Sequence, residues 1–285
     1  MAIRNARKAR FLTLLTIRGF LRDMAKLVPL FSSSRGNSYY VSGNASAILV
    51  DAGRNCKQIE LALASNGLSM ERVGAVFVTH EHTDHVSALK VLLKKYRLPV
   101  IATAGTLEQL IAGDKLPAGI ACTVIEDEID VGGFMVRRVQ TSHDAAESCG
   151  FHITTPDGRR CAIVTDTGYL TDDARHAIGQ SDLAVVESNH DIGMLRSGPY
   201  PYALQQRILS DIGHLSNRSC AEALPAFVNG GVTRIILAHL SGENNSADTA
   251  LSEAMRSLSA AGMTADRDYI IDVAPPASIG KGMVF

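Results

Sequence analysis

Four potential metal-binding side chains fall within six consecutive residues, directly after an apolar run at 73–78 that predicts a buried β-strand. These side chains are His80, His82, Asp84 and His85. Histidines two residues apart in an extended segment point the same way, so His80 and His82 can hold one ion. The other two come where a helix over 84–95 is expected to begin, and they can face a second ion. The pattern therefore predicts a metal centre at the end of this strand.

Further candidate ligands stand at the ends of later apolar runs. They are His143, Asp166 and His239. A single histidine at the end of a strand is more often a hydrogen-bonded core residue than a metal ligand. Three such residues in series favour ligands, because one short cluster cannot complete two coordination shells. Imidazole and carboxylate groups without thiolate suit Zn²⁺ or Mn²⁺, so we predict two divalent ions per chain, zinc or manganese.

Short β-rich runs alternate with amphipathic stretches from residue 24 onward. Strands are expected at 26–31, 38–41, 47–50, 73–78, 100–102, 123–125, 135–140, 150–154, 161–165, 183–186, 234–238 and 269–273, and helices at 57–65, 84–95, 202–211, 219–229 and 247–260. A strand-rich part followed by strand–helix alternation occurs twice, which predicts an α/β fold of two sheets packed face to face with helices outside. The polar clusters all follow strand ends, where layered α/β folds assemble ligand sites.

Residues 1–23 carry several arginines and one lysine around a short apolar stretch. The stretch is too short for a secretory signal and lacks a small-residue cleavage site. A basic helix lying on a membrane surface is one interpretation. We adopt the other, a basic N-terminal extension that is disordered. The folded domain is accordingly expected to span residues 24–285.

Composition limits the compartment and the partners. The five cysteines are scattered and include no Cys-x-x-Cys pair, which argues against a disulfide framework and suits a reducing cytosol. No apolar run approaches the roughly 18 residues that cross a bilayer. The net charge of −1 means that a nucleic-acid partner must be held by a local patch and by metal. We therefore predict a cytoplasmic protein with no membrane partner.

The order of the candidate ligands resembles that of the metallo-β-lactamase superfamily, and the resemblance covers essentially residues 24–285. It implies an αββα sandwich of two mixed sheets. Carried over position by position, it implies that His80, His82 and His143 hold the first ion, that Asp84, His85 and His239 hold the second, and that Asp166 bridges them.

Two segments of the last third resemble ribonuclease Z-like phosphodiesterases. Segment 213–216 matches the region of a catalytic histidine that binds no metal, here His214, and segment 186–189 matches the place of a glutamate that orients it, here Glu187. Cleavage of a phosphodiester expels an alkoxide, and an imidazolium held by a carboxylate can protonate it near neutral pH. The alternatives are a structural hydrogen bond for His214 and a surface carboxylate for Glu187.

Five segments, taken as a set, resemble the YycJ/WalJ branch of the superfamily. They are 32–38, 142–147, 187–191, 213–217 and 239–245. This resemblance implies a bacterial two-metal 5′→3′ exonuclease that acts on double-stranded DNA, releases 5′-phosphonucleotides and has a link to DNA repair. In the implied mechanism Asp84 holds the second ion and accepts the proton of the nucleophile. His214, steadied by Glu187, then protonates the leaving 3′-oxygen.

Four more residues are candidate substrate contacts: Ser33, Ser34, Asn37 and His190. The first three can bind phosphate through hydroxyl and backbone donors, although a plain Gly/Ser turn explains them equally well. His190 belongs either near the substrate or in the core. Two rival functions remain. One is a metal-dependent hydrolase of a small phosphodiester or thioester on the same ions. The other is a catalytically silent binding module, which would be expected to lack metal ligands that this sequence retains.

Overall fold

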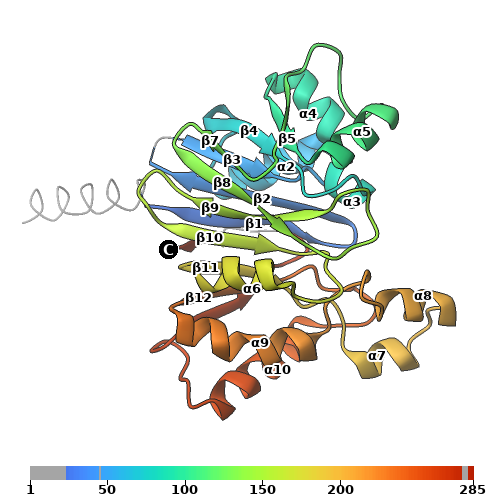
Figure 1. Ribbon diagram of the computed structural model, residues 1–285, viewed down its shortest axis with the longest axis vertical. Helices are drawn as coiled ribbons and strands as arrows, with labels where there is room; N and C mark the ends of the chain where they lie inside the picture. The colour runs from blue at the N-terminus through green and yellow to red at the C-terminus, as the bar shows by residue number, and fades with distance from the viewer. Residues whose placement is uncertain (1–23, 45, 278–281) are drawn as a thin grey trace, which may run out of the picture.

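The computed structural model describes residues 24–44, 46–277 and 282–285. Within them, two mixed seven-stranded sheets pack face to face, and helices cover both outer faces (Figure 1). The predicted α/β sandwich is therefore confirmed. The prediction of a disordered extension at 1–23 lies outside the described residues.

The first sheet has the strand order β14-β1-β2-β3-β4-β5-β6. Its strands are β1 (Lys26–Ser33), β2 (Gly36–Gly43), β3 (Ser46–Val50), β4 (Val73–Phe77), β5 (Val100–Ala102), β6 (Cys122–Val124) and β14 (Met283–Val284). β1, β2 and β3 pair antiparallel through tight turns, whereas β3 to β6 run parallel. Parallel neighbours require crossover connections, and helices supply them here.

The second sheet has the order β13-β12-β11-β10-β9-β8-β7. Its strands are β7 (Glu128–Val131), β8 (Phe134–Gln140), β9 (Cys149–Thr154), β10 (Arg160–Val164), β11 (Leu183–Glu187), β12 (Arg234–Ala238) and β13 (Ile270–Val273). β10 to β13 are parallel, and β11 is buried along its whole length. Such continuous apolar strands are typical of parallel sheets that are covered on both faces.

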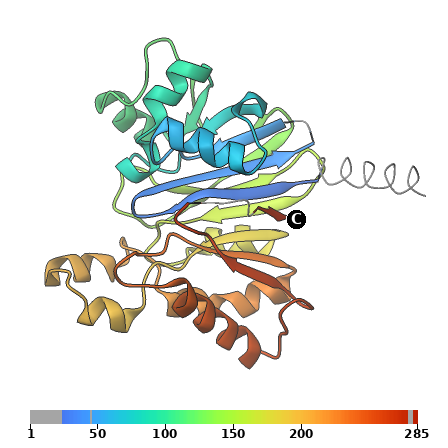
Figure 2. The same ribbon diagram turned by 180° about the vertical axis from the view of Figure 1, so that it is seen from behind.

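The helices form the two outer layers (Figures 1 and 2). α2 (Cys56–Ser65), α4 (Leu89–Tyr96) and α5 (Ala104–Ala112) cover the first sheet, and α6 (Asp172–Gly179), α9 (Asn217–Gly230) and α10 (Ala247–Ala260) cover the second. Between the sheets, the rings of Phe77 and Phe151 meet edge to face at 5.4 Å. In the described ranges 24–44, 46–277 and 282–285, no helix is long and apolar enough to cross a membrane.

The prediction of a single helix at 84–95 is wrong, because the structure has two helices there, α3 (Thr83–Val86) and α4. The backbone N–H of Ala88 donates to the carbonyl of Ala52 at 2.8 Å instead of continuing a helical ladder. Gly53 beside it packs so tightly against the Asp84 carbonyl that a Cβ would collide with it. Contacts with the loop after β3 therefore override the helical pattern.

Several short elements were not predicted: α5, α6, β7, β14 and α7 (Ile192–Ser197). α7 and the predicted α8 (Tyr202–Ile208) project together from one end of the sandwich, on the side where α3 lies (Figure 1). They connect β11 to α9.

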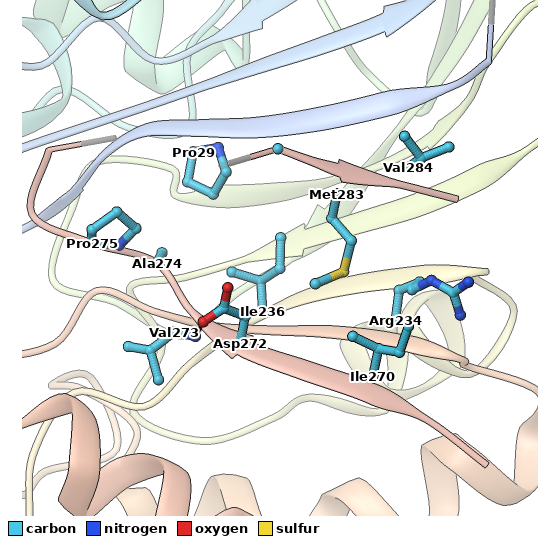
Figure 3. Close-up of a pocket in the computed structure, with 11 residues that line it drawn as sticks. Pro29, Arg234, Ile236, Ile270, Asp272, Val273, Ala274, Pro275, Met283 and Val284 are labelled. Carbon is cyan, nitrogen blue, oxygen red and sulfur yellow. Dashed lines mark hydrogen bonds between the residues drawn. The ribbon is translucent and has the colours of Figure 1, made fainter. Parts of the chain in front are cut away.

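A cavity of about 380 Å³ opens at an edge of the sandwich, between β1 and β14 of one sheet and β12 and β13 of the other. Figure 3 shows Met283 reaching toward Ile236 and Asp272, while the side chain of Arg234 extends away from them. Its lining contains no histidine or cysteine among the described residues, so it offers none of the predicted metal chemistry.

Candidate metal centre and active site

Strand ends aim several polar side chains at one place. Asp51, Asp166 and His239 follow β3, β10 and β12 closely, and all three adopt left-handed backbone conformations with φ of 60°, 57° and 55°. Such conformations are uncommon outside glycine, and short polar residues and histidine tolerate them best. The chain therefore turns abruptly where each strand ends, which brings these side chains to the same end of the sandwich.

The structure brings all seven predicted metal ligands together. Their ligand atoms form three groups, within each of which the atoms lie no more than 4.8 Å apart: His80, His82 and His143; Asp84, His85 and His239; and His80, His85 and Asp166. The first two groups match the two ion sites that the resemblance implies, and the third joins them through Asp166. A fourth group combines Asp166 and His239 with Glu187 and His214.

Three of the candidate ligand atoms are buried and have no hydrogen-bond partner among the described residues. They are Nε2 of His80, Oδ2 of Asp166 and Nε2 of His239. A buried polar atom without a partner costs about 1–3 kcal/mol, and three such atoms in one cluster of imidazoles and carboxylates are accounted for by a bound cation. Imidazole nitrogen and carboxylate oxygen are ligands that zinc and manganese accept. The donor set therefore fits divalent cations.

In four of the candidate ligands, Nδ1 of the imidazole ring contacts an oxygen atom. Nδ1 of His85 lies 2.7 Å from Oδ2 of Asp51, and Nδ1 of His143 donates to the Gly213 carbonyl at 3.1 Å. Nδ1 of His239 contacts Glu187 at 2.9 Å, and Nδ1 of His80 lies 3.0 Å from the Thr79 hydroxyl. Such contacts fix the ring orientation and turn Nε2 toward the cluster of candidate ligands.

Asp51 is a functional candidate that the sequence interpretation missed. It is fully buried, and besides His85 it accepts hydrogen bonds from the backbone N–H and the hydroxyl of Thr79, at 2.9 and 2.8 Å. It thereby joins the end of β3 to the histidine cluster after β4. The only available signal was an aspartate directly after an apolar strand.

The carboxylates change the protonation of the cluster. Burial alone would lower the pKa of His239, but Asp166, Asp84 and Glu187 outweigh it and raise the pKa to about 10. For His85, burial is likewise outweighed, here by Asp166, Asp51 and Asp84, and its pKa lies well above the usual value. Without a cation these imidazoles hold protons between the carboxylates, and an arriving cation would replace them.

Glu187, at the end of β11, joins three loops. Its Oε1 contacts Nδ1 of His214 at 2.8 Å and Nδ1 of His239 at 2.9 Å. Its Oε2 accepts the backbone N–H groups of Thr167 and Leu215 at 2.9 and 3.1 Å. Burial would raise the pKa of Glu187, but His214 and His239 lower it to about 2. The alternative of a surface carboxylate is wrong, because Glu187 is completely buried.

A cavity of about 230 Å³ lies beside the candidate ligands. His82, Asp84, His143, Asp166, His214 and His239 line one side of it, and Tyr200, Leu204, Arg207 and Ile208 line it from α8 and the residues before α8. Arg207 forms a two-pronged ion pair with Asp144, at 2.5 and 3.0 Å, which ties α8 to the loop that carries His143. The cavity is therefore bounded by groups from both sheets and from the projecting helices.

The four candidate substrate contacts lie at different depths. Ser34 is exposed and lines the cavity. Asn37 is buried, and its amide donates to Oδ2 of Asp84 at 3.1 Å, so it braces a candidate ligand. Ser33 is buried behind the turn, and its backbone N–H donates to the Asn37 side chain. His190 is 1% exposed, and burial lowers its pKa to about 4. Their contact with substrate stays a prediction.

Sequence comparison identifies the family. A model described as a beta-lactamase superfamily domain matches residues 46–240. The chain belongs to the metallo-β-lactamase superfamily. Within it, the chain lies in the YycJ/WalJ-like branch: it is 39% identical to the exodeoxyribonuclease YycJ of Bacillus anthracis over 219 residues, which are 76% of this chain and 82% of that protein.

Two further relatives agree with this placement. The exodeoxyribonuclease WalJ of Streptococcus pneumoniae is 34% identical over 256 residues, 86% of this chain and 93% of that protein. The crystal structure of the metallo-β-lactamase fold protein YhfI from Bacillus subtilis superposes with a TM-score of 0.66 at 18% identity and covers 90% of this chain and 98% of that one. The second likeness shows the shared fold alone.

Proposed function

We propose that this superfamily member is a metal-dependent exonuclease that removes nucleotides from double-stranded DNA in the 5′→3′ direction and releases 5′-phosphonucleotides. Relatives named exodeoxyribonucleases support the reaction class, since the match extends over most of both chains. The observation that carries the proposal is the contact of Glu187 with His214 at the edge of the ligand cluster. It provides a proton donor beside the place where a phosphodiester would lie.

We assign the ligands as the resemblance implies: His80, His82 and His143 to one ion, Asp84, His85 and His239 to the other, with Asp166 between them. The groups of mutually close ligand atoms support this division. When bound, two such ions lower the pKa of water and neutralise charge on the phosphate oxygens. Zinc and manganese both suit the donors, and we propose one of them as the native metal.

His214 acts as the general acid in this scheme. Its side chain lines the cavity, and Nδ1 is engaged by Glu187, so Nε2 is the atom that can protonate the leaving 3′-oxygen. The ionised Glu187 stabilises the imidazolium before transfer and fixes its orientation. Asp84, which is partly exposed to the cavity, accepts the proton of the attacking water. The phosphodiester is thereby cut with a proton delivered on the side of the leaving group.

The decisive experiment incubates metal-loaded protein with duplex DNA labelled at the 5′ end in one sample and at the 3′ end in another. We expect labelled mononucleotides early from the 5′-labelled strand and only progressive shortening of the 3′-labelled strand. Asp84→Ala should abolish both, and His214→Ala should slow both by about 100-fold or more. His176→Ala is the matched control, because His176 is an exposed histidine on α6, outside the cavity lining.

Three results would contradict parts of the proposal. Equal loss from both ends, or cleavage of RNA alone, would remove the assigned polarity or substrate. Strong hydrolysis of a small phosphodiester or thioester with none of DNA would favour the rival hydrolase.

The placement in the cytoplasm and the link to DNA repair belong to the same proposal. The link to DNA repair would be tested by measuring whether a deletion strain leaves mismatched bases uncorrected.

A further inference from the structure

The side of the cavity formed by α8 differs chemically from the side formed by the ligands. We call Tyr200, Leu204 and Ile208 the α8 wall. Leu204 and Ile208 are four residues apart and share one face of α8, and Tyr200 just before the helix joins them in lining the cavity. The rest of the lining is polar: it presents the imidazoles and carboxylates of the candidate site, Ser34, Asn189 and Ser241, and the guanidinium of Arg207 from α8. A charged phosphodiester needs that polar side, so an apolar wall suits a different part of the substrate.

The α8 wall is fixed relative to the reactive groups. The carbonyl of Ile208 accepts the backbone N–H of His214 at 3.0 Å, so the wall is bonded directly to the proposed general acid. Gln205 donates its side-chain amide to the carbonyl of Tyr200 at 2.9 Å, which holds Tyr200 against the start of α8. The ion pair of Arg207 with Asp144 secures the same helix against the loop that carries His143. The wall therefore stands at a set distance from the cleavage point.

The size of the cavity indicates what it can hold. Its volume of about 230 Å³ lies below the roughly 300–1,000 Å³ of pockets that enclose drug-sized ligands. One nucleotide unit is the part of a DNA strand that matches such a space beside the ligand cluster. An enzyme that degrades DNA of any sequence must accept every base, and a ring surface does so because each base has a π-face.

We propose that the α8 wall receives the base and sugar of the nucleotide being removed, with the ring of Tyr200 stacking on the base and Leu204 contacting the sugar. This inference rests on the proposed function and adds the part of the site that binds the nucleoside. It makes Tyr200 a substrate-binding residue that acts on all four bases alike.

The test measures kcat/KM on two duplexes that differ only in the nucleotide removed first, which is intact in one and abasic in the other. We expect Tyr200→Ala to reduce kcat/KM on intact DNA by about tenfold or more and to leave the abasic duplex within about twofold of wild type. Tyr200→Phe should restore the intact-DNA rate because it keeps the ring. Tyr202→Ala is the matched control, since Tyr202 is 75% exposed at the start of α8 and lies outside the cavity lining.

A binding measurement separates this inference from the proposed function. Calorimetry on the wild type should show tighter binding of thymidine 5′-monophosphate than of 2-deoxyribose 5-phosphate, and Tyr200→Ala should remove the difference. The proposed role of the α8 wall would be wrong if Tyr200→Ala lowered kcat/KM equally on intact and abasic duplexes, or if the wild type bound the two ligands equally. Either result would leave the proposed exonuclease function standing. If the wild type bound the nucleotide more tightly but cleaved no DNA, the proposed function would be wrong instead.

Discussion

The carboxylate of Glu187 lies 2.8 Å from Nδ1 of His214, and the two differ sharply in exposure, with Glu187 completely buried and His214 open to the cavity. A buried carboxylate that accepts four hydrogen bonds stays ionised, as its pKa of about 2 indicates. The negative charge of Glu187 therefore lies directly against Nδ1 of His214.

Glu187→Gln removes this charge while keeping the shape of the side chain. The amide cannot stabilise an imidazolium, and its nitrogen cannot accept the N–H groups of Thr167 and Leu215. We expect kcat on DNA to fall about 100-fold, with KM changed much less. Steady-state kinetics will show this, and Glu222→Gln on the exposed face of α9 serves as the control. A change confined to KM would contradict the assigned role.

His214→Ala should slow the cleavage of DNA by about 100-fold or more without loss of metal. The defect should shrink on a thymidine phosphodiester with a p-nitrophenolate leaving group, because that group departs without a proton. His239→Ala provides the contrast, since we expect it to lose bound metal as well as activity. Elemental analysis and the two substrates together decide between a proton donor and a ligand at position 214.

Metal uptake should depend on pH. The pKa of His239 is raised to about 10 and that of His85 lies well above its usual value, so both are protonated in the metal-free protein at neutral pH. An ion must displace those protons, and the apparent affinity for Mn²⁺ should rise between pH 6.5 and 8.5 by about tenfold per pH unit for each proton released. Calorimetry in buffers of different ionisation enthalpy counts the protons. Affinity that stays constant with pH would refute the prediction.

Asp51→Asn should weaken metal binding without unfolding the protein. Asparagine tolerates the left-handed backbone at this position but cannot serve as the anionic acceptor for Nδ1 of His85. The expected loss in affinity is about 10–100-fold. A competition assay with a zinc chelator measures it, and Asp114→Asn, at an exposed aspartate paired with Lys90, is the control.

The sequence was sufficient to find the candidate ligands that the structure brings together, because histidine is scarce and its spacing carries the signal. His80, His82 and His85 stand out within one loop, and the later histidines end strands that were themselves recognisable. Two sheets of buried β-rich runs follow from the same pattern. The order of the strands within those sheets required the structure.

Other parts of the site depend on distant pairing that no local pattern contains. Asp51 resembles an ordinary turn residue until folding places it against His85, 34 residues away. Leu204 and Ile208 have the spacing of a helix face that packs on the core, and only the projection of α8 beside the ligands gives them another role. The split of the helix at Ala88 likewise comes from its contact with Ala52.

The candidate ligands come from loops of both sheets: His80, His82, Asp84 and His85 follow β4, whereas His143, Asp166 and His239 follow β8, β10 and β12. Ions bound among them would cross-link the two sheets of the sandwich at one end. Amide hydrogens in these loops should therefore exchange with deuterium much more slowly once metal is added. Those in the interior of β3 and β11 should change little, because the apolar layer between the sheets already protects them.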